Sequence, residues 1–167
     1  MRLFVCFVFS ALLFSRPPAA EAGTIPRLAA APAVRYWSVL SEPRFTRTAG
    51  GVISDKETGL EWLEGPDVPS SWEMAQEWIR GLGDGWRTPT LKELEAIYLP
   101  DSTRKGKYGD PLCLDPVFLR DSGYSLWSVQ RFDGTAWMYD FSRGYAHWLD
   151  VYFPGRFDRA AAVRESR

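Results

Sequence analysis

Cysteine and histidine are scarce in this sequence, which has two cysteines and one histidine among 167 residues. A structural zinc site needs several of these residues at set spacings, so the sequence contains no zinc motif. Its loop aspartates are scattered and do not form the EF-hand pattern of a calcium site. We therefore expect no metal and no cofactor.

Neither sign of charge is in excess, since 20 Lys and Arg stand against 21 Asp and Glu. The basic excess typical of nucleic-acid binding is missing, so we expect no nucleic-acid partner. Aromatic residues, by contrast, make up 15% of the chain and include eight tryptophans. Because disordered chains are poor in aromatic residues, the sequence predicts a folded domain.

Long apolar runs are absent after Leu3–Phe14, at the start of the chain. This run is shorter than the about 20 residues that a membrane-spanning helix needs, and Ala20-Glu21-Ala22 follows it as a signal-peptidase pattern. A buried N-terminal helix or an uncleaved anchor is the alternative to a signal peptide. We predict a signal peptide over 1–22, a lead-in over 23–42 and one domain over 43–167. The protein is then periplasmic, secreted or on the cell surface, with no transmembrane segment after cleavage.

After cleavage Cys113 is the remaining cysteine and has no partner for an internal disulfide. It is either a buried side chain that packs like a small hydrophobic residue, which we expect, or a pairing site for another chain.

The first half of the domain predicts a hairpin and two helices. Val52-Ile53 and Leu60–Leu63 are strand-like and flank a turn sequence. Ser70 and Glu73 form a capping-box pattern before a helical apolar stripe that ends at Gly81, Gly83 and Gly85. Thr90 and Glu93 form a second capping box, and Pro100 ends the helix that follows.

The last third predicts strands over 125–132, 135–141, 145–153 and 160–163. Asp133-Gly134 between the first two is a strong hairpin signal. Residues 101–116 are polar, contain Gly and Pro, and predict a loop. Together these elements predict an α+β domain with two helices packed on a twisted antiparallel sheet.

Several motifs in this order resemble the DUF1566 family, also called the Lcl (Legionella collagen-like protein) C-terminal domain family. The matching blocks are Gly51–Trp62, Trp86–Leu94, Asp115–Phe118, Leu126–Ser128 and Ala136-Trp137, with Ala162–Arg164 at the family's closing strand. The resemblance implies a fold like that of C-type lectins and formylglycine-generating enzymes, in a bacterial exported protein. The family's namesake is a surface adhesin whose terminal domain is associated with sulfated polysaccharides.

The sequence departs from this family at Ala162, where members often have cysteine, so the resemblance implies no disulfide for Cys113. The oxidase chemistry of the formylglycine-generating relatives relies on cysteine thiolates, which one cysteine cannot supply. We interpret the motif residues as determinants of the fold instead of ligand contacts. They are Asp55, Thr58, Gly59, Trp62, Trp86, Arg87, Pro89, Thr90, Glu93, Trp127 and Trp137. Arg87 in particular is expected to bond loop carbonyls and stack on an indole.

The aromatic stretch after Arg143 is our candidate ligand site. On a strand, Trp148, Asp150 and Tyr152 share one face, where rings can stack on sugars and carboxylates can accept hydroxyl hydrogen bonds. Alternatively, one face of this strand packs in the core, the other face is solvated, and neither binds a ligand. The candidate ligand-binding residues are Arg143, Tyr145, His147, Trp148, Asp150, Tyr152 and Arg156.

No catalytic residue is predicted. His147 has no nucleophile in a Gly-x-Ser-x-Gly motif, and Asp150 falls on the opposite face of the strand. We therefore expect a non-catalytic exported module that binds polysaccharide or an envelope protein. A structural or assembly protein of the envelope is the second hypothesis, and an enzyme is the third.

Overall fold

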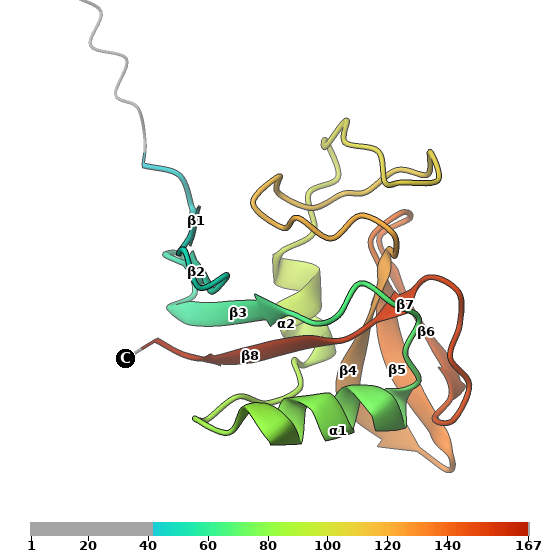
Figure 1. Ribbon diagram of the computed structural model, residues 1–167. Helices are drawn as coiled ribbons and strands as arrows, with labels where there is room; N and C mark the ends of the chain where they lie inside the picture. Colours follow the sequence, from blue (N-terminus) through green and yellow to red (C-terminus); the bar gives the residue numbers. More distant parts are fainter. Residues whose placement is uncertain (1–41, 167) are drawn as a thin grey trace, which may run out of the picture. The chain divides into compact units, whose positions relative to one another are not determined.

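The computed structural model describes residues 42–166, which form two helices and eight strands (Figure 1). The helices are α1 (Trp72–Leu82) and α2 (Leu91–Ala96). The strands are β1 (Phe45–Arg47), β2 (Ile53–Asp55), β3 (Leu60–Glu64), β4 (Ser125–Phe132), β5 (Thr135–Asp140), β6 (Tyr145–Asp150), β7 (Asp158–Arg159) and β8 (Ala161–Glu165). The α+β class is therefore confirmed. The predicted signal peptide and most of the lead-in lie outside the described residues.

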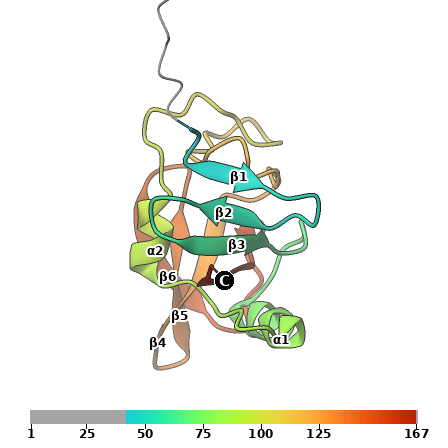
Figure 2. The ribbon, with the colours of Figure 1, turned by 90° about the vertical axis from the view of Figure 1, so that its left-hand side faces the viewer.

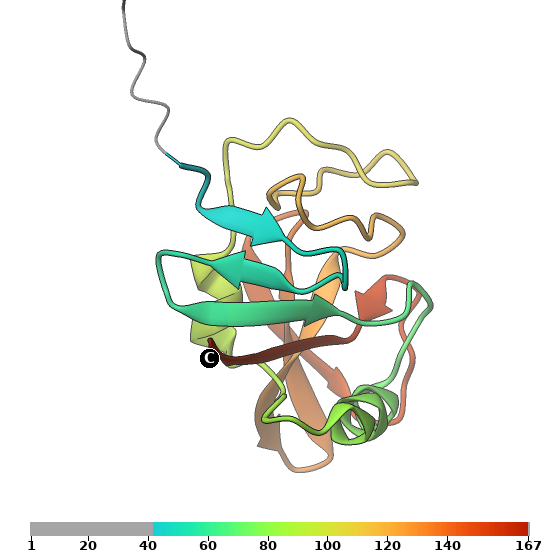
Figure 3. The same cartoon turned by 60° about the vertical axis from the view of Figure 1, so that its left-hand side comes forward.

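The first sheet contains β1, β2, β3 and β8 in that order, with every neighbouring pair antiparallel. Figure 2 shows β1, β2 and β3 side by side. The predicted hairpin is β2–β3, and Gly59 in its turn adopts a φ of +71°, which glycine reaches without strain. β8 returns from the end of the domain to lie beside β3 (Figure 3), with Val163 opposite Trp62. The closing strand is thus confirmed.

Helix α1 forms as predicted, but its cap lies one residue later. Ser71 is the N-cap, and its hydroxyl accepts a hydrogen bond from the Met74 amide at 3.2 Å. The predicted capping box of Ser70 and Glu73 is wrong, because the Ser70 amide donates to Asp158 at 3.0 Å and so joins the strand region. Gly81 lies within the helix, and Gly83 ends it with a φ of +60°.

Helix α2 has both hydrogen bonds of the predicted capping box. The Glu93 amide donates to Thr90 Oγ1 at 3.2 Å, and the Thr90 amide donates to Glu93 Oε2 at 2.7 Å. Leu94 and Ile97 are fully buried beneath the helix. The helix ends at Ala96, before Pro100, so it is only six residues long.

The second sheet has the order β6-β5-β4-β7. Strands β4, β5 and β6 form the predicted antiparallel meander, and Asp133 and Gly134 both have positive φ in the turn between β4 and β5. β7 pairs with β4 in parallel. The structure therefore has two sheets where the sequence predicted one antiparallel sheet. The reason is that β7 and β8 follow each other closely in the chain but pair with different sheets.

Two apolar cores lie on opposite faces of the second sheet. The first is enclosed by the first sheet, α2 and one face of the second sheet, and contains Trp62, Leu94 and Tyr139. The second lies against α1 and contains Trp72 and Trp127. Since strand side chains alternate, Leu126 and Trp127 in β4 point to different cores.

Neither helix of the described residues combines the length and apolarity that a bilayer crossing requires.

Candidate functional site

The turn between β2 and β3 uses its motif residues for structure. The carboxylate of Asp55 is 2% exposed and accepts two hydrogen bonds from the Arg44 guanidinium, at 2.7 and 2.8 Å. It also accepts the Thr58 hydroxyl at 2.8 Å and the Glu57 amide at 3.0 Å. Burial opposes ionisation of Asp55, but these donors outweigh it and lower the pKa of the carboxyl. The acceptor atoms of the Asp55 carboxylate are thus used to hold the turn and to fix Arg44 beside it.

The second motif block ties α2 to the first sheet. Arg87 makes a bidentate ion pair with Glu93, at 2.6 and 2.9 Å, and exchanges two backbone hydrogen bonds with Val163 in β8. Pro89 is buried, and its carbonyl accepts the Val129 amide at 2.8 Å. The stacking on an indole that was predicted for Arg87 is made by another arginine. The guanidinium of Arg164 lies over the Trp86 ring, at 4.3 Å from its centroid. Arg164 comes from β8, which the local sequence could not place here.

Two of the motif tryptophans are core residues. Trp62 and Trp127 are each 1% exposed. The Trp127 indole donates to the Ser70 carbonyl at 2.8 Å, which fixes the start of α1 against β4. Neither ring has the exposure that ligand contact would need.

The candidate ligand residues of β6 lie on the two faces that strand alternation predicted. Tyr145 and His147 share one face, with ring centroids 5.6 Å apart, and Arg143 donates to the Tyr145 hydroxyl at 3.3 Å. Trp148 and Asp150 lie on the other face. Of the candidate residues in β6, only Trp148 and Asp150 therefore share the face that was predicted to bind a ligand.

Tyr152 does not share this platform, because β6 ends at Asp150 and does not reach Phe153. The Asp150 carboxylate accepts the Tyr152 amide at 2.8 Å, and the Asp150 carbonyl accepts the Phe153 amide at 3.2 Å. These bonds close a turn that buries Val151 and turns Tyr152 into a separate shallow hollow. The prediction that Tyr152 continues the strand was wrong.

Arg156 is placed by the long loop before β4. Its guanidinium lies over the rings of Tyr108 and Phe157, at 4.7 and 5.1 Å from their centroids. Phe157 in turn stacks on Tyr124 at 4.5 Å. These stacking contacts, and not β6, fix the position of Arg156.

His147 is partly buried, and its Nδ1 has no hydrogen-bond partner in the part of the chain that the structure describes. Burial lowers the pKa of the imidazole, which Asp140 opposes and Arg143 reinforces. Residues 42–166 contain no group of three His, Cys, Asp or Glu side chains arranged to hold a metal. Cys113 is buried as expected, at 5% exposed.

A shallow groove near the β4–β5 turn brings several exposed aromatic side chains together. It is lined by Phe132, Asp133, Thr135, Trp137 and Trp148, and we call it the aromatic groove. Trp148 in β6 lies directly opposite Trp137 in β5, and Thr135 lies opposite Phe132 in β4. Phe132 is 76% exposed and Trp148 is 60% exposed. The groove therefore presents three aromatic rings beside a carboxylate and a hydroxyl.

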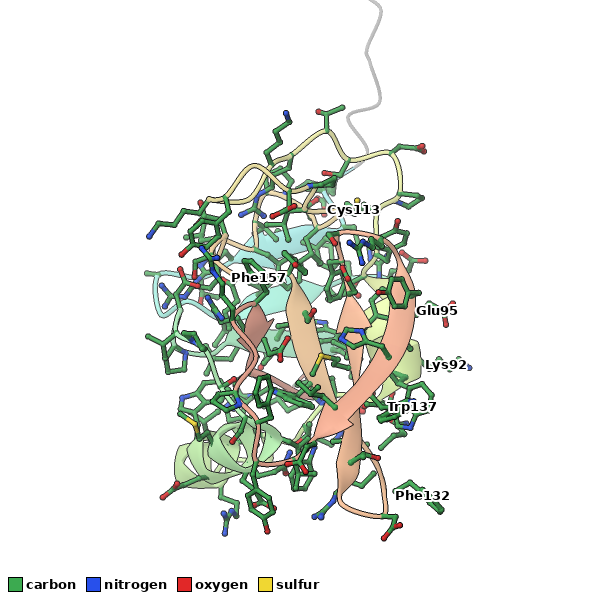
Figure 4. All side chains as sticks on the ribbon, turned by 90° about the vertical axis from the view of Figure 1, so that its right-hand side faces the viewer. Lys92, Glu95, Cys113, Phe132, Trp137 and Phe157 are labelled. Carbon is green, nitrogen blue, oxygen red and sulfur yellow. The ribbon has the colours of Figure 1, made fainter. Side chains whose placement is uncertain are left out.

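The groove is open because α2 starts beside β4 and runs away from the β4–β5 turn. The α2 amide of Leu91 donates to the Gln130 side chain at 3.0 Å, so the helix begins level with the second half of β4. From there it runs over Tyr139 and leaves the part of the sheet next to the β4–β5 turn uncovered (Figure 4). Figure 4 shows Lys92 of α2, then Trp137, then Phe132 along one side of the molecule.

Sequence reasoning found only part of this groove. Trp148 was a predicted ligand residue and Trp137 a predicted motif residue, whereas Phe132, Asp133 and Thr135 were read only as a hairpin. A register shift between Trp127 and Arg131 decides which face Phe132 occupies, and no sequence signal predicts it. The pairing of Trp137 with Trp148 could have been found by aligning the two strands across their turn.

The family model of the Lcl C-terminal domain matches residues 51–161, which contain both helices, strands β2 to β7 and the groove. The chain belongs to the Lcl C-terminal domain family. A search of curated proteins gave no match. Membership of the Lcl C-terminal domain family indicates a surface-associated domain. The C-type-lectin-like description of this fold stays a prediction.

Proposed function

We propose that this Lcl C-terminal domain is a non-catalytic, exported module that binds polysaccharide at the bacterial surface or envelope. The observation that carries the proposal is the aromatic groove, where Trp148 and Phe132 are exposed beside the partly buried Trp137. Exposing such rings to water is unfavourable, and clustered exposed aromatics are typical of binding surfaces.

The chemistry of the groove suits a sugar chain. The apolar face of a pyranose ring can pack on an indole, while its hydroxyls need polar partners at the rim. Asp133 lines the groove, and Asp150 lies on the same face, opposite Thr135. The shallow, open shape suits an extended polymer that passes over the surface.

A protein partner of the envelope is the second candidate, because the same rings could receive apolar side chains. Assembly through a disulfide of Cys113 receives no support, since this side chain is buried.

A glycan-array screen of the purified protein tests the proposal, with Trp148→Ala and Tyr152→Ala variants in parallel. Tyr152 is the matched control, because it is an exposed aromatic residue outside the groove, at 74% exposed. We expect Trp148→Ala to weaken glycan binding about tenfold or more, with Tyr152→Ala close to the unmodified protein. Parallel arms with calcium and with a chelator show whether binding needs this ion.

Equal glycan binding by all three proteins would show that the aromatic groove is not the glycan-binding site. Absence of binding to every glycan, by a protein whose folding is verified by circular dichroism, would favour the protein partner.

A further inference from the structure

The outer edge of β6 is unpaired along its length in residues 42–166. Because β6 pairs with β5 on one side only, alternate residues direct their backbone groups away from the sheet. The Val151 amide donates to the Gly134 carbonyl at 3.1 Å, so the odd-numbered residues of β6 pair with β5. Ala146 and Trp148 therefore direct both their amide and carbonyl groups outward. Asp150 does so with its amide alone, since its carbonyl accepts the Phe153 amide.

The other sheet edges are protected in ways that β6 is not. β1 has three residues and ends in Arg47, β8 is bonded to Arg87 through Val163, and β7 accepts the Ser70 amide. β6 has six residues, Tyr-Ala-His-Trp-Leu-Asp, with neither lysine nor proline. Natural proteins block exposed edges with such residues, so an unblocked edge of this length is suited to pairing with another strand.

The charges and sizes along β6 are complementary to β6 itself in the antiparallel direction. Arg143 precedes the strand and Asp150 ends it, so an antiparallel copy places the basic end of one strand beside the acidic end of the other. The antiparallel direction also allows the small Ala146 of one copy to lie opposite the large Trp148 of the other. A parallel neighbour would instead set like charges side by side.

We infer that two copies of this chain associate through their β6 strands, antiparallel about a two-fold axis, into one continuous sheet. Ala146 of each copy pairs with Trp148 of the other, because these are the residues whose amide and carbonyl are both unpaired. His147 then lies opposite its own copy, and Tyr145 lies opposite Leu149. In this register the Trp148 indole lies beside a methyl group, so the ring remains accessible.

This arrangement extends beyond the proposed function, and its test is independent of any glycan. A two-fold axis perpendicular to the sheet places both aromatic grooves on the same side of the dimer. If the grooves bind polysaccharide, one polymer could engage both of them and gain avidity.

Sedimentation equilibrium of the protein at submillimolar concentration gives the first test. We expect a dimer mass for the unmodified protein and a monomer mass for Ala146→Pro. Proline removes the outward amide, which β5 does not use, and edge strands tolerate it there. Ala146→Ser, which keeps the amide, is the matched control and should stay dimeric. Circular dichroism and thermal unfolding verify that each variant is folded.

A disulfide experiment tests the register. His147→Cys places two thiols opposite each other at a closely spaced antiparallel pair, within reach of a disulfide. Mild oxidation should convert this variant to a covalent dimer, while Tyr145→Cys, whose thiols lie far apart across the axis, should stay monomeric on a nonreducing gel. A monomer mass for the unmodified protein, or equal cross-linking of the two cysteine variants, would overturn the inference and leave glycan binding unaffected.

Discussion

Replacing Asp158 by asparagine should stabilise the protein at neutral pH. Asp158 begins β7 and is 6% exposed, and the Gly155 backbone makes a hydrogen bond with its carboxylate. The guanidinium of the neighbouring Arg159 is bonded instead to Ser122 and Asp67. Burial therefore dominates, and it raises the pKa of the Asp158 carboxyl to about 6.

The magnitude follows from the difference between the folded and unfolded proteins. The unfolded carboxyl has a pKa near 3.8, so the folded protein holds this proton more tightly between about pH 4 and 6. Stability consequently falls as pH rises through this window, and the full cost is present above pH 6. Two pKa units correspond to about 3 kcal/mol of unfolding free energy, which is an upper estimate.

Asparagine keeps the shape of the side chain and carries no charge, so Asp158→Asn does not bear this cost. Urea unfolding at pH 4, 5, 6 and 7 measures the difference between the variant and the unmodified protein. We expect this difference to move in favour of the variant by up to about 3 kcal/mol across the series, mostly below pH 6.

Asp55→Asn provides a control of opposite sign. The pKa of Asp55 is lowered, so its stabilising contribution is present above pH 3.8 and is lost in more acidic solution. Asp55→Asn should therefore be destabilising at pH 7 and less so in acid. If the Asp158→Asn difference were constant from pH 4 to 7, the account of a buried, uncompensated carboxyl would be refuted.

Four further substitutions test the packing and the helix cap by urea unfolding. Gly144→Ala should lower the unfolding free energy by about 2–4 kcal/mol, because φ is +72° and the new methyl lies 2.4 Å from the Tyr98 ring. Gly134→Ala is its control, because φ is +77° but the surrounding space is open, and it should lower the unfolding free energy by about 1 kcal/mol. Thr90→Ala removes the acceptor for the Glu93 amide and should cost about 1 kcal/mol, so an unchanged midpoint would argue against the cap. Trp127→Phe leaves the buried Ser70 carbonyl without its indole donor and should cost about 1–3 kcal/mol; a smaller loss would show that another donor replaces it.

The elements that the sequence predicted well are those whose signals are local. The capping box of Thr90 and Glu93 lies within one helical turn, and the Asp133-Gly134 turn needs only two residues of positive φ. The aromatic alternation of β6 also places Trp148 on its correct face. In each case the residues that determine the geometry are neighbours in the sequence.

The arrangement of these elements depends on contacts between distant residues, which no local pattern contains. Ser70 and Ser71 are equally good caps in sequence, and the choice depends on the pairing of Ser70 with Asp158. Arg156 has its position because Tyr108, far away in the chain, supplies the ring beneath it. The division into two sheets has the same origin, since the pairing partners of β7 and β8 lie far before them in the sequence.

The family motif explains the fold but leaves the binding surface undetermined. Asp55, Arg87 and Trp127 make hydrogen bonds within the domain, and Trp62 is buried in its core, so these side chains have little left to offer a ligand. Binding must then use groups that the fold leaves unsatisfied. In the described residues two such features meet at β6: the uncovered rings beside the start of α2, and the unpaired backbone edge next to them. A helix that began several residues before Leu91 would cover the rings, and a proline or lysine in β6 would block the edge. Trp148 contributes its ring to the groove and its backbone to the edge, so ligand binding and self-association can be separated by changing one or the other. Trp148→Ala should remove ligand binding and keep the dimer. Ala146→Pro should remove the dimer and keep ligand binding.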